Sequence, residues 1–172
     1  MWGGWLLDPE RPVAIVTPAE GHAREVTRWL VRIGVTRFAG TLAGGMDAWT
    51  KKAGEFSSIQ QLSVQELNKR LDDRNLQIFD VRSPSEWDHG HIPNARYLFL
   101  PEMPKRLGEI DRSRPVAVYC GTGYRASIAA SLLKREGFDV SSIPGSFDGW
   151  LSAGYEVVIP KSQGKASDTR RG

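Results

Sequence analysis

Thiols and long apolar runs are both scarce in this sequence. Cys120 is the only cysteine among the 172 residues, which excludes an intrachain disulfide and favours a reducing compartment, so we expect a cytoplasmic location. The N-terminal stretch lacks a cluster of basic residues, and its only apolar run is Trp5, Leu6 and Leu7. Since a membrane span needs about 18 apolar residues, we expect neither a signal peptide nor a membrane partner.

An excess of one charge sign is also nearly absent. The sequence holds 23 Lys and Arg residues against 20 Asp and Glu residues, and the whole excess lies in residues 161–172. A nucleic-acid site needs clustered surface cations, whereas a few basic residues in a terminus that contains Gly and Ser are typical of a flexible tail. We therefore expect a disordered basic tail over 159–172 and no nucleic-acid partner.

The sequence repeats part of itself. PVAIVT over 12–17 matches PVAVYC over 115–120, and GGMDAW over 44–49 matches GSFDGW over 145–150. Each copy reads as a strand, a loop, an amphipathic helix, a second strand and a Gly-rich turn into a short helix. Strands that alternate with helices predict an α/β fold with a parallel sheet.

Only the second copy has a front half. Two capping boxes, SVQE over 63–66 and SPSE over 83–86, each predict a helix start, and QIFDV over 77–81 predicts a buried strand. We therefore expect a complete α/β domain over 56–158. Residues 1–55 are then the back half of a second domain with open strand edges. We expect this half to pack against the complete domain, to pair with another chain, or to be completed by a further part of a longer protein.

A reactive-cysteine site is predicted where the second copy's first strand ends. Cys120 follows the strand, the loop Gly121, Thr122, Gly123 and Tyr124 comes next, and Arg125 lies in the following helix. Open α/β sheets bind ligands at this edge, and the positive end of a helix stabilises a thiolate. The two glycines allow backbone N–H groups to turn inward, and Arg125 adds a cation, so the loop fits an anion.

Three other interpretations fit parts of this stretch. A free cysteine at a strand end is often simply a buried apolar residue. Gly121-x-Gly123-x-x-Ala126 fits a dinucleotide fingerprint, but the expected acidic residue about 20 positions later has no strand-end candidate, so we expect no cofactor. Cysteine-based phosphatases use a longer loop than the four residues between Cys120 and Arg125.

Residues 58–157 resemble a rhodanese, or sulfurtransferase, domain. The motifs follow the family's order: Asp80-Val-Arg82, Glu86-Trp87, Gly90-His91-Ile92-Pro93-Asn94-Ala95, the Cys120–Arg125 loop and Gly145-x-x-Asp148-Gly-Trp150. The resemblance implies three layers, with a central parallel sheet flanked by helices. It further implies that Cys120 accepts sulfane sulfur as a persulfide, that residues 121–125 cradle it, and that Arg125 holds the donor's anionic end. The implied partners are a small-molecule donor, thiosulfate or a persulfide, and a thiol or cyanide acceptor.

Four further residues are expected to support the site. We expect Arg82 and Glu86 to form an ion pair that fixes the loop, and Asp80 to accept hydrogen bonds from loop N–H groups near Cys120. His91 is expected to tie a turn together, and no metal site is expected because two nearby histidines without a further Cys or His cluster are a weak signal.

The first copy departs from the pattern at its reactive positions. Thr17 and His22 stand where the second copy has Cys120 and Arg125, so residues 1–55 are expected to be inactive. The order of the two parts is also similar to the C-terminal region of fusion proteins in which a metallo-β-lactamase-fold persulfide dioxygenase precedes rhodanese domains. A persulfide dioxygenase domain or a second copy of the chain is therefore an expected partner. Two other functions stay open: a non-enzymatic persulfide carrier or redox sensor, and a cysteine-based phosphatase.

Overall fold

The structure is a computed structural model that describes residues 4, 7–18, 20–53 and 56–160. The chain divides into two compact units, Met1–Ser58 (unit 1) and Ile59–Gly172 (unit 2). The predicted basic tail lies almost wholly outside the described residues, since only 159 and 160 are described. No helix within the described ranges is long and apolar enough to cross a membrane.

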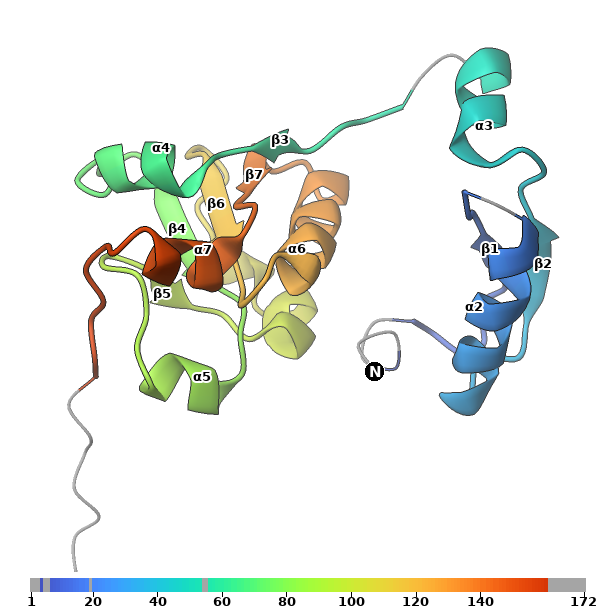
Figure 1. The fold of residues 1–172 in the computed structure, drawn as a ribbon, viewed down its shortest axis with the longest axis horizontal. Coiled ribbons are helices and arrows are strands. Elements are labelled where there is room, and N and C mark those ends of the chain that lie inside the picture. The colour runs from blue at the N-terminus through green and yellow to red at the C-terminus, as the bar shows by residue number, and fades with distance from the viewer. Residues whose placement is uncertain (1–3, 5–6, 19, 54–55, 161–172) are drawn as a thin grey trace, which may run out of the picture. The chain divides into compact units, whose positions relative to one another are not determined.

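Unit 2 is built on a five-stranded parallel sheet, as predicted, with helices on both faces (Figure 1). The strand order is β3-β7-β6-β4-β5. The strands are β3 (Gln60–Gln61), β4 (Gln77–Asp80), β5 (Arg96–Tyr97), β6 (Val116–Tyr119) and β7 (Val140–Ser142). The helices are α4 (Val64–Lys69), α5 (Pro84–Asp88), η1 (Leu100–Lys105), η2 (Leu107–Glu109), α6 (Tyr124–Arg135) and α7 (Ser146–Ser152).

The core of unit 2 joins its front half, residues 59–112, to its back half, residues 113–153. Helix α4 contacts α7, and together they cover one face of the sheet, while α6 contacts η1. One buried cluster contains Val64, Leu67, Leu76, Ile78 and Ile92 from the front half and Ala117, Tyr119, Ile143, Phe147 and Trp150 from the back half. Both β4 and β6 are buried along their whole length, as strands covered on both faces must be.

The helix starts follow the local signals in the sequence. Ser63 caps α4 and Ser83 caps α5, and each forms a complete capping box with the glutamate three residues later. Pro84 occupies the first turn of α5, where its missing N–H costs nothing. Both predicted capping boxes are confirmed.

Unit 1 has the same order of elements as the back half of unit 2. It contains β1 (Val13–Ile15), α2 (Glu20–Arg32), β2 (Phe38–Thr41) and α3 (Gly45–Ala53), and β1 pairs with β2 in parallel. Among its described residues the buried apolar side chains are few, namely Ile15, Ala23 and Val35, whereas Trp29 and Trp49 are 57% and 45% exposed. A two-stranded unit of this kind buries little apolar surface of its own.

Candidate active site

Cys120 lies at the point where the chain reverses its direction of travel across the sheet. From β4 the chain continues to β5 on one side, and from β6 it continues to β7 on the other. Ligands of open α/β sheets bind beside the carboxyl ends of the strands at such a switch point. Cys120 directly follows β6, and Asp80 ends the neighbouring β4. The topology therefore places the single thiol at the expected ligand edge.

The sulfur of Cys120 faces the beginning of α6. The Gly123 N–H donates to Cys120 Sγ at 3.1 Å, and Gly123 is the residue that precedes the helix. Its φ of 119° is one that side chains other than glycine's rarely adopt, so this position requires glycine. The positive end of a 12-residue helix and a directed N–H group both stabilise negative charge on the sulfur.

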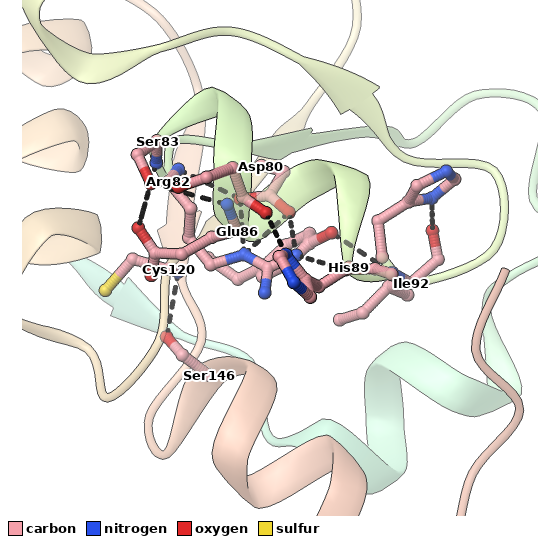
Figure 2. Close-up of polar contacts among 12 residues, drawn as sticks. Asp80, Arg82, Ser83, Glu86, His89, Ile92, Cys120 and Ser146 are labelled. Atoms are coloured by element: carbon pink, nitrogen blue, oxygen red, sulfur yellow. Dashed lines mark hydrogen bonds and ion pairs between the residues drawn. The ribbon is translucent and has the colours of Figure 1, made fainter. Parts of the chain in front are cut away.

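The backbone of Cys120 is fixed by the turn that leads into α7. The Cys120 N–H donates to Ser146 Oγ at 3.1 Å (Figure 2). That hydroxyl donates to the Ile143 carbonyl at 2.8 Å. The Phe147 N–H donates to the Cys120 carbonyl at 2.9 Å. Ser146 is fully buried with a φ of 49°. Our sequence interpretation missed this residue, although its place inside the repeated Gly-rich turn is a signal that could have identified it.

Arg125 is locked against Glu86 of α5. Its two terminal nitrogens, Nη1 and Nη2, donate to the two carboxylate oxygens of Glu86, each at 2.6 Å. This pairing, aided by hydrogen bonds from Ser83, lowers the pKa of Glu86 to about 2. Glu86 in turn raises the pKa of Arg125, and Cys120 acts in the same direction. The bidentate pair thus ties the Cys120 loop to the capping box of α5.

The loop residues between Cys120 and Arg125 differ in exposure. Gly121 leaves little room for a side chain, because an added Cβ would lie 3.3 Å from Arg125 Nη2. Thr122 and Tyr124 are exposed, Tyr124 to 70%. These two side chains therefore form the outer rim of the loop, while Cys120 itself is 1% exposed.

Asp80 and Arg82 form a buried pair beneath the site, and this differs from the prediction. Arg82 Nη2 donates to Asp80 at 2.6 Å and to the Gly90 carbonyl at 2.6 Å, and the Arg82 N–H also donates to Asp80. Burial opposes the charge of Arg82, but Asp80 outweighs it and the pKa of Arg82 is raised. Arg82 therefore pairs with Asp80 and Glu86 with Arg125, so the expected Arg82–Glu86 ion pair is wrong. The expectation that Asp80 binds loop N–H groups near Cys120 is also wrong, because its oxygens face Arg82.

His91 closes the turn after α5. Its backbone N–H donates to the Val158 carbonyl and the Val158 N–H donates back, both at 2.9 Å. Its ring stacks on Trp87 with centroids 3.6 Å apart, and Nδ1 lies 3.1 Å from the Ile92 carbonyl. These contacts connect the turn to the chain that follows α7.

The corresponding edge of unit 1 has different chemistry. Thr17 follows β1, and a pocket of about 240 Å³ beside it is lined also by Val16, Pro18, Met46 and Asp47. Gly45 takes the place of Ser146 there, and a Cβ at Gly45 would come within 2.7 Å of the Thr17 carbonyl oxygen. Among the described residues of the whole chain, no three His, Cys, Asp or Glu side chains are grouped to hold a metal ion.

Comparisons with known proteins agree with this arrangement. The family described as Rhodanese-like domain matches residues 63–153. The thiosulfate sulfurtransferase GlpE of Shewanella oneidensis is 35% identical over 98 residues, which cover 56% of this chain and 97% of that protein. YrkF of Bacillus subtilis, named as a candidate sulfur carrier protein, is 30% identical over 139 residues, 75% of each chain. The crystal structure of a rhodanese-related protein from Thermoplasma volcanium is 25% identical and superposes with a TM-score of 0.56, covering 59% of this chain and 99% of that chain.

Proposed function

The chain belongs to the family of rhodanese-like domains, and from that membership we propose that it is a sulfurtransferase in which Cys120 carries sulfane sulfur as a persulfide. The observation that carries the proposal is the position of Cys120 Sγ, which accepts the Gly123 N–H at the start of α6. This environment supports the thiolate, which is the nucleophilic form of cysteine. The relatives named thiosulfate sulfurtransferase and candidate sulfur carrier support transfer of sulfur in general.

The reaction proceeds in two displacements at sulfur. In the first, the Cys120 thiolate attacks the outer sulfur of thiosulfate; a new S–S bond forms at Sγ, the donor's S–S bond breaks, and sulfite leaves with the electron pair. In the second, an acceptor thiolate attacks the outer sulfur of the persulfide, and the electron pair returns to Sγ. The thiolate is regenerated, so neither an oxidant nor a reductant is needed.

The chain's own residues stabilise the charge that moves through these steps. Gly123 donates its N–H to the sulfur that gains the electron pair in the second displacement. Arg125 is held by Glu86, so in our proposal it fixes the loop and contributes positive potential near Sγ. Direct binding of the donor's anionic end by Arg125 stays a prediction. Thr122 and Tyr124 are the exposed side chains that a donor or acceptor would meet first.

Intact mass spectrometry tests the persulfide directly. The purified protein is mixed with thiosulfate, and separately with glutathione persulfide, and is compared with Cys120→Ser. We expect the wild type to gain the mass of one sulfur atom and Cys120→Ser, with an unchanged circular dichroism spectrum, to gain none. Equal gain by the variant, or no gain by the wild type with either donor, would refute the proposal.

A non-enzymatic sulfur carrier is the second candidate, and the name of the YrkF relative favours it. A carrier loads once and waits for a specific protein acceptor, whereas an enzyme turns over with a small acceptor. Repeated release of sulfite from thiosulfate in the presence of cyanide or a free thiol identifies the enzyme. A single stoichiometric burst identifies the carrier.

The remaining sequence predictions stand as parts of the same proposal. We propose that unit 1 does not catalyse sulfur transfer, because Thr17 occupies the position of the nucleophile and a threonine hydroxyl cannot form a persulfide. Cytoplasmic location, the identity of the donor and acceptor, and the resemblance to a persulfide dioxygenase fusion stay predictions from the sequence.

A further inference from the structure

We propose that unit 1 is a docking surface for a polypeptide that repeats the front half of unit 2. The surface, called here the unit 1 face, comprises Ala14, Val16, Leu42, Met46 and Trp49. The proposed occupant supplies a strand that pairs in parallel with the free edge of β1 and a helix that covers the unit 1 face. This inference goes beyond sulfur transfer and does not depend on it.

The backbone of unit 1 repeats several hydrogen bonds of the back half of unit 2, although a register shift between Val13 and Ala14 has no counterpart in β6. The Leu42 N–H donates to the Ile15 carbonyl, as Ile143 does to Val118. The Val35 N–H donates to the Leu30 carbonyl where α2 ends, as Phe138 does to Leu133 after α6.

The equivalence also includes the turn before β1. The Glu10 N–H donates to the Asp8 carboxylate at 2.9 Å, as Ser113 does to Asp111. The two segments therefore correspond from Asp8 and Asp111 onward, with an offset of 103 residues up to Val35 and of 101 residues from Leu42 onward.

That equivalence identifies what the unit 1 face is built to contact. In unit 2 the buried cluster takes five residues from the back half, and their unit 1 counterparts are the five residues of the unit 1 face. All five counterparts are apolar, yet none is buried. Trp150 is 0% exposed and Trp49 is 45%, while Phe147 is 9% and Met46 is 49%. In unit 2 the side chains packed against these positions come mainly from residues 59–112, and Tyr155 and Val157, which follow α7, also pack on the cluster.

The backbone at the edge of β1 also indicates a partner equivalent to the front half of unit 2. In unit 2, β6 lies between β7 and β4, and each of its four residues has a partner on β4. Within the described residues, β2 is the only strand that pairs with β1. The opposite edge of β1 is therefore open to a parallel strand, which is the place that β4 takes beside β6.

A polar residue at the rim matches the same occupant. Arg114 of unit 2 donates through Nε to the Asn75 carbonyl at 3.1 Å, and through Nη2 to the Arg74 carbonyl. Both acceptors belong to the front half. Its counterpart Arg11 is exposed in unit 1. An occupant with the front half's turn would offer Arg11 the same two carbonyl oxygens, so the open strand, the apolar face and the rim cation all fit one partner.

Adding a copy of the front half of unit 2 tests the proposal. A second copy of residues 59–103 is joined in front of Met1 of the full chain, which keeps the 103-residue spacing of the repeat. A control chain carries Ile78→Asp in the added copy only. Hydrogen exchange is then measured on peptides that contain Val13–Ile15 in the original chain and in both extended chains. We expect exchange there to slow by about tenfold or more only with the unaltered added copy.

Three results would overturn the proposal. One is equal exchange in all three chains, which includes failure of the added copy to fold. Another is slow exchange in the original chain when that chain is a dimer, because a second copy of the chain would then cover the unit 1 face. The third is slow exchange in the original chain as a monomer, which would mean that the chain covers the face by itself. Because sulfur loading of Cys120 is not the readout, failure of the proposed function would leave this test unaffected.

Discussion

At the scale of single residues, the bond between Arg125 and Glu86 connects the reactive loop to a second element. Glu86 accepts from both terminal nitrogens of Arg125 and also accepts from the Ser83 backbone and hydroxyl. Glu86 therefore completes the α5 capping box and also holds the Cys120 loop in place. Side chains that position a reactive group within fractions of an ångström have large effects on rate without touching the substrate.

Glu86→Gln is expected to lower kcat/KM for sulfur transfer by about 10- to 100-fold, because the loop loses its bidentate restraint. Initial rates with thiosulfate and cyanide measure this, and circular dichroism checks the fold. Glu109→Gln is the matched control, since Glu109 also forms a bidentate pair, with Arg106, outside the Cys120 loop. Equal losses in the two variants would show that the Glu86–Arg125 pair has no special role.

Acid sensitivity gives a second prediction for Glu86. Its pKa lies at about 2 in the folded protein against an ordinary 4.5, so its contribution to stability is complete above about pH 4.5 and is lost as the pH falls toward 2. The difference in Tm between wild type and Glu86→Gln should therefore be largest near pH 6 and shrink at pH 3. Glu66, Asp73, Glu109 and Asp111 also have lowered pKa values, so only the difference between the two proteins is diagnostic. A difference that stays constant over this range would contradict the assignment.

At the scale of elements, the two capping boxes allow a comparison of the same local structure with and without a bond to the reactive loop. Ser63 and Ser83 have the same local geometry, and each hydroxyl accepts the backbone N–H three residues later. The glutamate of the first box, Glu66, has no bond to the reactive loop among its described contacts, whereas Glu86 of the second box holds Arg125.

Ser63→Ala and Ser83→Ala should each cost about 1 kcal/mol of unfolding free energy, because each removes a cap. Only Ser83→Ala should also slow sulfur transfer, since it frees one side of Glu86. Urea unfolding and initial rates measure the two effects. If Ser63→Ala slowed sulfur transfer and Ser83→Ala did not, the assignment of the second capping box to the reactive loop would be wrong.

Local signals explain which elements the sequence predicted. The capping boxes over 63–66 and 83–86, the buried strand β4 and the strand that precedes Cys120 all follow from neighbouring residues and were predicted. The partners of Arg82 and Glu86 were not, because Glu86 meets Arg125 from 39 positions away and Arg82 turns back to Asp80. Ser146 was missed for the same reason, since its bond to Cys120 depends on where β7 places the next turn.

At the scale of the whole molecule, the repeated tryptophans report on two different environments. Trp150 is fully buried and its indole N–H donates to the Glu156 carbonyl at 2.8 Å. Trp49 holds the same position in unit 1 and is 45% exposed. The same repeat position is therefore occupied by a buried core tryptophan in unit 2 and by a partly exposed tryptophan in unit 1.

Trp150→Ala should destabilise unit 2 by about 3–5 kcal/mol, because it opens a cavity in the buried cluster. Trp49→Ala should cost about 1 kcal/mol or less. Sulfur loading of Cys120 follows the denaturant unfolding of unit 2, and hydrogen exchange of Val13–Ile15 follows that of unit 1. A loss at Trp49 as large as that at Trp150 would mean that the unit 1 face is already covered.

Because the only thiol is buried, its rate of chemical labelling measures how often the surrounding loop opens. Cys120 is 1% exposed, so a bulky alkylating reagent can reach Sγ only when the surrounding loop opens. With one cysteine in the chain, every labelled molecule records one such event, and no second site confuses the signal. The labelling rate, divided by the intrinsic rate of a small thiol, then gives the fraction of time that the loop between β6 and α6 stands open.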